Sequence, residues 1–270
     1  MPKASEPIGI FDSGIGGLTV ARAVNKLMPY ENLIYFGDTA HLPYGDKSTA
    51  AIQAYSIKIC DILLKSGCKV ILIACNSASA AAFELIKEYT GKKACVFNVI
   101  DPVVNYLREK YHDSKIGLIG TRQTVHSNVY KKKIDDLGNG IDLQSLATPL
   151  LVPMIEEGYI NKQISQDIIC EYLKNPILKD IQALILGCTH YPLIKDQIAA
   201  YYHNSIEILD SSEVVAASLK AYLEYNNLLF NENKSQTSSF MVSDYTTSFE
   251  ELTRLFFSKQ VKLEKYPLWE

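Results

Sequence analysis

Residues 184–192 read LILGCTHYP, an apolar run that ends in glycine and is followed by a thiol, a hydroxyl and an imidazole. A nearly continuous apolar run is typical of a strand that is buried on both faces of a parallel sheet. The residues that follow have the spacing of an amphipathic helix. The stretch therefore predicts a buried strand that leads directly into a helix, with Cys188, Thr189 and His190 at the junction.

The same alternation of short apolar runs and longer amphipathic stretches continues through the rest of the chain. Strands are expected at residues 7–11, 32–36, 69–74, 115–120, 141–146, 181–187, 206–209 and 240–243. Helices are expected at residues 16–28, 48–66, 77–90, 122–137, 190–202, 212–225 and 246–257, and a polar loop at 231–239. Strands that alternate with helices form right-handed βαβ units around a mostly parallel sheet, so the predicted fold class is α/β.

Two pairs of segments indicate an internal duplication. The sequence IGIFDSG at 8–14 is similar to IGLIGTR at 116–122, and VILIACNSAS at 70–79 is similar to ALILGCTHYP at 183–192. Because apolar strands resemble one another, chance similarity is the alternative. The two pairs are separated by nearly equal offsets, and a cysteine followed by polar residues ends both members of the second pair. These features favour two related α/β halves.

Composition and charge exclude several classes of protein. The chain has 270 residues, of which 47% are apolar, so it is long enough for one large domain or two small ones and too apolar for disorder. Its net charge of −3 gives no electrostatic reason to expect nucleic acid or an acidic membrane as a partner. No apolar stretch approaches the roughly 20 residues of a membrane span, and no secretory signal is recognisable, so a cytoplasmic protein is expected. The six cysteines form no Cys-x-x-Cys pair and are expected to be free thiols.

Two cysteines occupy equivalent places in the two predicted halves. Residues 75–77 (Cys-Asn-Ser) and 188–190 (Cys-Thr-His) each follow a strand and open a helix. Ligands of open α/β sheets bind beyond the carboxyl ends of the strands. A helix N-terminus favours the thiolate, so the pKa of both cysteines is expected to fall below about 8.5. Either cysteine alone would more often be structural, but two equivalent ones favour a chemical role.

The turn FDSGIGG at 11–17 follows the first strand and is rich in glycine. It is not a P-loop, because no Gly-Lys-Ser/Thr follows, and it is not a G-x-G-x-x-G motif, because Thr19 stands where the last glycine would be. Asp12, at the end of a strand, has a carboxylate that can orient an ammonium group or accept a proton. The backbone amides of the turn also suit an anion. An ordinary capped turn is an equally good interpretation of this segment taken alone.

Other candidate residues are less specific. The loop at 37–48 is dense in Gly, Asp and Pro, and Tyr44 and Gly45 are candidates for the wall of a pocket, although a surface turn is the simpler interpretation. Glu156 and Glu157 lie just beyond an apolar turn, and paired glutamates are usually solvated. No His and Cys residues have zinc-ligand spacing, so no metal site is expected.

Taken together, six ordered segments resemble the glutamate racemase family, within the aspartate/glutamate racemase superfamily. They are Asp12–Gly17, Pro43–Gly45, Ala74–Ala78, Gly120–Thr121, Val152–Gly158 and Gly187–Pro192. Two positions depart from the family pattern: Ser77 replaces a common threonine but keeps the hydroxyl, and Thr148 stands where many members have a further cysteine. Neither position is one of the two cysteines discussed above.

The resemblance implies an architecture for the whole chain. It implies two similar three-layer α/β domains related by a pseudo-twofold axis, which face one cleft and contribute one cysteine each. Residues 1–98 with 209–270 would form the first domain, and residues 99–208 the second. A hinge between the domains is a hypothesis for residues 97–101 and 208–212.

The resemblance also implies an activity, namely the interconversion of L- and D-glutamate without cofactor or metal, which supplies D-glutamate for peptidoglycan synthesis. Members of the family are often dimers, so a homodimer is favoured. Cys75 and Cys188 would be the two catalytic bases, Asp12 and His190 would assist them, and Glu156 would support the second side. The residues that would hold the amino acid are Asp12, Ser13, Tyr44, Gly45, Asn76, Ser77, Thr121, Thr189 and His190.

Three other functions would also use some of these features. A racemase for another acidic amino acid, such as aspartate, would share the fold and the cysteines, but the detailed motifs favour glutamate. A cysteine hydrolase would use Cys188 or Cys75 as a nucleophile. His190 follows Cys188 by only two positions, whereas such partners normally come from distant segments. A non-enzymatic anion-binding module would use the turn at 11–17.

Overall fold

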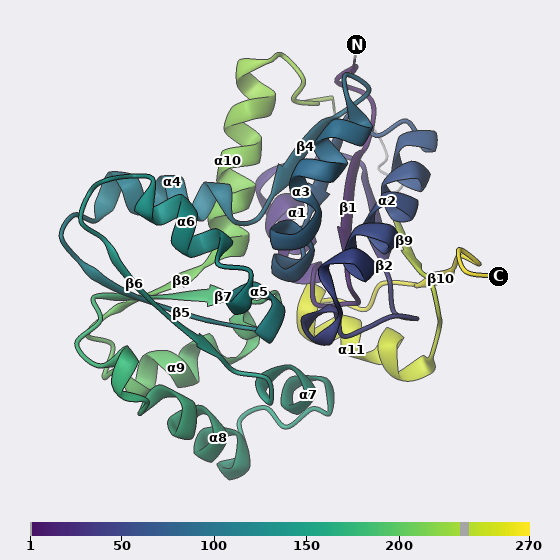
Figure 1. Cartoon of the computed structure of the whole chain (residues 1–270). Coiled ribbons are helices and arrows are strands. Elements are labelled where there is room, and N and C mark those ends of the chain that lie inside the picture. The colour runs from purple at the N-terminus through teal and green to yellow at the C-terminus, as the bar shows by residue number, and fades with distance from the viewer. Residues whose placement is uncertain (1, 233–237) are drawn as a thin grey trace.

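Every strand pair in the described part of the chain, residues 2–232 and 238–270 of this computed structural model, is parallel. The strands form two sheets, each with helices packed around it (Figure 1). The first sheet has the order β10-β9-β2-β1-β3-β4, with β1 (Ile8–Asp12), β2 (Leu33–Gly37), β3 (Val70–Ile73), β4 (Cys95–Asn98), β9 (Ser239–Val242) and β10 (Glu264–Lys265). The second has the order β6-β5-β7-β8, with β5 (Lys115–Gly120), β6 (Asp142–Ala147), β7 (Ala183–Gly187) and β8 (Glu207–Asp210).

The two sheets share one strand order. Strands β2-β1-β3-β4 of the first sheet correspond to β6-β5-β7-β8 of the second, so the segments that are similar in sequence occupy equivalent places. The prediction of an α/β protein with mostly parallel sheets and two similar halves is confirmed. Neighbouring strands also end level with one another, since Asp12 pairs with Gly37 and Gly120 pairs with Gly187.

The helices follow the strands in chain order. In the half that contains the first sheet they are α1 (Leu18–Leu27), α2 (Thr49–Lys65), α3 (Asn76–Thr90), α10 (Ser211–Tyr225) and α11 (Thr247–Phe257). In the other half they are α4 (Asp101–Lys110), α5 (Arg122–His126), α6 (Val129–Asp135), α7 (Leu151–Glu156), α8 (Gln163–Leu173) and α9 (Lys195–Tyr201). Helix α10 packs against both α1 and α4 and so bridges the two halves (Figure 1). No helix within the described ranges has both the length and the apolar character that a membrane span requires.

Some elements differ from those predicted. The single helix expected at 122–137 is two helices, because Asn128 between α5 and α6 has a left-handed backbone with φ of 56°. The helix expected from 190 begins as a 3₁₀ turn, Tyr191–Ile194, before α9. Strands β4 and β10 and helices α4, α7 and α8 were not predicted. The loop expected at 231–239 lies largely outside the described residues.

The cores explain the continuous apolar runs. Every residue of β1, β3 and β7 is buried, as expected for strands covered by helices on both faces. Cys60 and Cys68 pack in the core of the first half as small apolar residues, and all six cysteines are free thiols.

The chain passes between the sheets twice. It leaves the first sheet after Asn98 at the end of β4, and it leaves the second after Asp210 at the end of β8. The predicted second boundary, after residue 208, falls inside β8, which pairs with β7 along its whole length. The division into two domains stays a prediction. Its second boundary fits the structure better after Asp210, where β8 ends and the chain returns to the first half.

Candidate active site

Both cysteines follow strands that lie at a change of direction in their sheets. From β1 the chain adds β2 on one side and then β3 on the other, and β5, β6 and β7 repeat this arrangement. Ligands of open parallel sheets bind at such points, beyond the carboxyl ends of the strands. In the first sheet, Asp12 is the last residue of β1 and Cys75 follows the end of β3. In the second sheet, Thr121 follows β5 and Cys188 follows β7.

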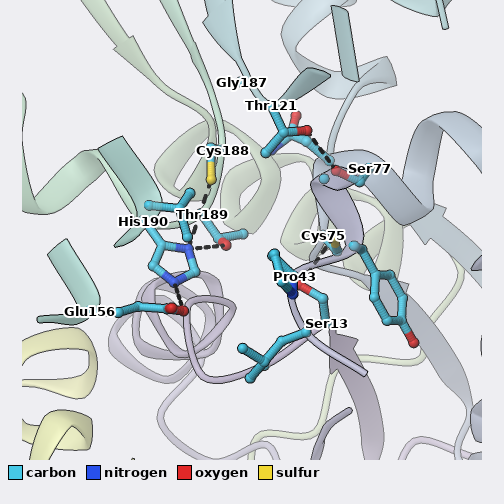
Figure 2. Close-up of a pocket in the computed structure, with 16 residues that line it drawn as sticks. Ser13, Pro43, Cys75, Ser77, Thr121, Glu156, Gly187, Cys188, Thr189 and His190 are labelled. Atoms are coloured by element: carbon cyan, nitrogen blue, oxygen red, sulfur yellow. Dashed lines mark hydrogen bonds and ion pairs between the residues drawn. The ribbon is translucent and has the colours of Figure 1, made fainter. Parts of the chain in front are cut away.

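One cavity lies between these strand ends, and both halves line it (Figure 2). It encloses about 30 Å³, which is room for about two water molecules. Of the residues predicted for the site, those that line the cavity are Ser13, Tyr44, Gly45, Cys75, Asn76, Ser77, Thr121, Glu156, Cys188, Thr189 and His190. The Cys75 and Cys188 side chains therefore share one cavity, and Figure 2 shows them on opposite walls of it.

Cys75 forms the wall contributed by the first half. Its Sγ caps α3 by accepting a hydrogen bond from the Ala78 N–H at 3.5 Å, and the thiol donates to Ser13 Oγ at 3.7 Å. Burial, with the nearby Asp12 carboxylate, raises the pKa of Cys75 to about 12, although the Ala78 N–H and Ser13 act in the opposite direction. The prediction that the helix N-terminus would lower this pKa is wrong, because desolvation outweighs one long amide contact.

Cys188 lies in a chain of three side chains on the opposite wall (Figure 2). Its Sγ is 3.8 Å from His190 Nδ1, and His190 Nε2 is 2.9 Å from Glu156 Oε1. Burial lowers the pKa of His190, but the hydrogen bonds with Cys188 and Glu156 outweigh it and raise the pKa to about 10. At neutral pH the imidazole is therefore protonated, and it places a positive charge beside the Cys188 sulfur.

Asp12 lies behind the wall rather than on it. Its Oδ2 accepts hydrogen bonds from the backbone N–H groups of Gly14 at 3.1 Å and Gly17 at 2.9 Å. Burial raises the pKa of its carboxyl, which the charge on His190 and the amides of the turn partly offset. A Cβ at Gly17 would lie 2.5 Å from the Asp12 Cβ, so this position requires glycine. Because Asp12 occupies these two amides, the turn is poorly suited to bind an anion of its own.

Uncommitted polar atoms remain around the cavity. Asn76 Oδ1 accepts a hydrogen bond from the Tyr130 hydroxyl at 2.9 Å, whereas its buried Nδ2 has no partner among the residues that the structure describes. The same holds for Asp12 Oδ1. Ser77 Oγ and Thr121 Oγ1 are 2.9 Å apart and join the two halves across the cavity (Figure 2). A donor and an acceptor thus remain available for a polar ligand.

Several contributors were missed by sequence reasoning. Leu42, Pro43 and Val152 line the cavity, and their apolar side chains do not mark them as site residues, although Pro43 and Val152 begin two of the segments that carry the family resemblance. Thr19, noted only as a departure from a glycine motif, donates its hydroxyl to the carbonyls of Gly16 and Thr189, both at 3.0 Å. It links the two halves directly behind the cavity, a contact that no local pattern reveals. Within residues 2–232 and 238–270, no three His, Cys, Asp or Glu side chains are grouped as metal ligands would be.

Comparison with known proteins assigns the family. Residues 18–219 match the Asp/Glu/Hydantoin racemase family. A glutamate racemase of Neisseria meningitidis serogroup C is 40% identical over 257 residues, which cover 95% of this chain and 94% of that protein. The glutamate racemase of Chlorobaculum parvum is 39% identical over 259 residues, which cover 96% of this chain and 95% of that protein.

Solved structures agree with the sequence comparison. The crystal structure of glutamate racemase from Francisella tularensis in complex with D-glutamate superposes with a TM-score of 0.92 at 36% identity, covering 98% of this chain and 99% of that one. An aspartate racemase homologue from Pyrococcus horikoshii, with a TM-score of 0.56 at 20% identity, shares the fold alone. The chain therefore belongs to the Asp/Glu/Hydantoin racemase family.

Proposed function

We propose that this chain interconverts L- and D-glutamate by removing the Cα proton from one face and delivering a proton to the other. The observation that carries the proposal is the pair of thiols, Cys75 and Cys188, one from each half, on opposite walls of one cavity. The relatives that match nearly the whole chain are named glutamate racemases, and the similar Francisella structure holds D-glutamate.

The two cysteines have different surroundings. The protonated His190 places a positive charge beside the Cys188 sulfur, whereas burial raises the pKa of Cys75 and so favours its thiol form. In one direction Cys188 removes the Cα proton while Cys75 gives its proton to the opposite face of the carbanion. The enzyme is left with a Cys188 thiol and a Cys75 thiolate, and the reverse reaction restores the first state. Well-placed acid–base groups contribute about 10²–10⁴-fold each.

The carbanion needs charge stabilisation at the substrate carboxylate, where negative charge develops. The unpaired Asn76 Nδ2 and the hydroxyls of Ser77 and Thr189 supply donors on the cavity wall. Asp12 Oδ1, which has no partner among the described residues, suits the substrate ammonium once the turn in front of it shifts. No cofactor has a part in these steps.

The cavity has to widen before it admits glutamate, because it encloses only about 30 Å³, the space of about two waters. We assign this widening to rotation of the two halves about the crossings near residues 97–101 and 208–212. Saturating D-glutamate should then change the small-angle scattering profile of the protein. Superimposable profiles with and without the ligand would contradict this hinge.

We further propose the cellular setting that the family resemblance implies. The chain would act in the cytoplasm as a homodimer and supply D-glutamate for peptidoglycan synthesis. A depletion strain that recovers when D-glutamate is added to the medium would support this role. Continued dependence on the protein despite D-glutamate uptake would contradict it.

The Cys188–His190–Glu156 chain also favours a second candidate, a thiol hydrolase. A cysteine beside an imidazole that a carboxylate orients is the usual arrangement of a nucleophilic thiol. Such an enzyme has no use for a second thiol on the opposite wall. A Cys75→Ser variant that keeps full catalytic activity towards esters or amides would support the hydrolase and contradict the racemase.

The decisive assay for the proposed function follows the optical rotation of L-glutamate incubated with the protein alone. Rotation should fall to zero, and Cys75→Ser and Cys188→Ser should each lower the rate at least about 100-fold, the effect of a lost acid–base group. The exposed Cys170 provides a matched control, and Cys170→Ser should racemise at the wild-type rate. Normal racemisation by either of the first two variants would refute the two-base proposal. L-Aspartate in place of L-glutamate tests the nearest rival substrate.

A further inference from the structure

A buried carboxylate outside the cavity is hydrogen-bonded to four side chains, two from its own loop and two from near the end of the sequence. Asp38 follows β2 and is fully buried. Its Oδ2 accepts the Tyr44 hydroxyl at 2.7 Å and lies 3.1 Å from His41 Nδ1. Its Oδ1 accepts the Ser243 hydroxyl at 2.7 Å and the indole N–H of Trp269 at 2.8 Å. A carboxylate has about four acceptor sites, so this set fills them.

The loop that Asp38 organises forms part of the cavity wall. Tyr44, which Asp38 holds by its hydroxyl, lines the cavity together with Gly45. Gly45 packs so closely against the other half that a Cβ there would lie 2.7 Å from the Thr121 Cβ. The Asp38 N–H also donates to the Asp12 carbonyl at 3.0 Å. A shift of the Asp38 carboxylate would therefore move Tyr44, and with it the cavity wall.

Trp269 reaches Asp38 from the far end of the sequence. Strand β10 pairs with β9, and the chain then carries the indole over the loop. The ring stands edge-on to His41, with centroids 4.4 Å apart, and to Tyr55, at 5.3 Å. The ammonium of Lys58 lies 4.6 Å from the centre of the indole. The indole is thus packed in a fixed orientation, with its N–H aimed at Asp38.

We propose that Trp269 is a positioning residue for substrate binding, acting through Asp38 on the wall formed by Tyr44 and Gly45. The inference rests on the proposed function. A buried carboxylate that loses one donor is left partly unpaired, and it recovers by drawing in water or shifting its remaining partners. Tyr44 is one of those partners. Because Tyr44 and Gly45 hold the ligand and transfer no proton, the effect should appear in KM rather than in kcat.

The test compares Trp269→Phe, which keeps an aromatic ring but removes the N–H donor, with Lys58→Met, which removes the cation above the same ring. Trp269→Phe should raise KM for both enantiomers of glutamate about 5-fold, the effect of one typical lost hydrogen bond, with kcat within about twofold of wild type. Lys58→Met should leave both constants within about twofold. An unchanged KM in Trp269→Phe would overturn the proposal, as would a fall in kcat alone.

A second measurement applies even if the variant folds poorly, because Trp269 is the only tryptophan in the chain. If formation of the Trp269–Asp38 hydrogen bond strengthens glutamate binding, glutamate must favour that hydrogen bond by the same coupling free energy. Saturating D-glutamate should therefore reduce acrylamide quenching of the wild-type fluorescence, and Tyr44→Phe should weaken that response. Identical quenching with and without D-glutamate would overturn the inference. A wild-type protein that does not racemise glutamate would instead refute the proposed function, so the two failures are distinct.

Discussion

Two cysteines at equivalent places in the two halves have different surroundings. Cys188 has a protonated imidazole 3.8 Å away, whereas Cys75 has a hydroxyl and one amide as close partners and the Asp12 carboxylate nearby. A positive charge therefore lies beside one sulfur, whereas burial raises the pKa of the other thiol. In the proposed mechanism this asymmetry distinguishes the two thiols, which exchange their roles between the two directions of the reaction.

The pH dependence should reveal the role of Glu156. Its hydrogen bond helps to raise the pKa of His190 from 6.5 to about 10, so the imidazolium is present below that value and is lost as the pH rises through it. Activity should therefore fall on the alkaline side near pH 10 in the wild type, and Glu156→Gln should move this fall to lower pH. The exposed neighbour Glu157 provides the control, since Glu157→Gln should leave the profile in place. A profile unchanged by Glu156→Gln would contradict the assignment of His190 as an imidazolium.

Individual site residues were only partly predictable. Both cysteines, His190 and Glu156 were identified from their motifs, and all four side chains line the cavity. Protonation was not predictable, because the pKa of Cys75 depends on how deeply the fold buries it. The position of Asp12 behind the cavity wall was not predictable either, because it depends on the hydrogen bonds from two backbone amides of its own turn.

The elements were predictable where the sequence pattern decides them. Continuous apolar runs identify buried strands such as β3 and β7, and polar residues after them mark the starts of helices. Strand β4 was not predictable because it is only four residues long and mostly half-buried, so its apolar pattern is weak. The division between α5 and α6 was not predictable, because the helical pattern of the sequence continues through Asn128, whose left-handed backbone separates the two helices.

Thr19 at the start of α1 should matter through its hydroxyl. It donates to the Gly16 carbonyl and, across the halves, to the Thr189 carbonyl, each at 3.0 Å. Thr19→Val keeps the shape but leaves both buried carbonyls without this donor, so kcat/KM should fall about 5- to 10-fold. Thr19→Ser keeps the hydroxyl and should stay within about threefold of wild type. Equal losses in the two variants would show that packing of the methyl group, rather than the hydrogen bonds, matters here.

At the scale of the whole molecule, the duplication in the sequence predicted the arrangement well. Similar segments occupy equivalent strands of two sheets, and their carboxyl ends face one cavity. Long-range ties were not predictable, because they join residues that share no local pattern. Trp269 on Asp38 is one such tie, and Lys69 is another.

Lys69 should determine stability without affecting chemistry. It is fully buried, and its ammonium donates to Glu31 Oε2 at 2.6 Å and to the carbonyls of Ala4 and Leu228. Lys69→Met leaves the buried Glu31 carboxylate unpaired and should lower the free energy of unfolding by about 3–5 kcal/mol, measured by urea denaturation. The double variant Lys69→Met with Glu31→Gln should recover much of that loss. A loss of unfolding free energy below about 1 kcal/mol in the single variant would contradict this prediction, because it would mean that the buried pair stabilises the fold no more than a surface ion pair does.

The central claim is that two thiols act on opposite faces of one substrate, and hydrogen exchange in D₂O tests it most directly. Starting from either enantiomer, the wild-type enzyme should place solvent deuterium at Cα of the product in the first few per cent of reaction. The recovered substrate should still carry hydrogen, because the thiol on the product side has already exchanged with solvent while the thiol on the substrate side receives the substrate proton. Product that retains the substrate hydrogen, in either direction, would mean that a single base carries the proton across and would contradict the claim.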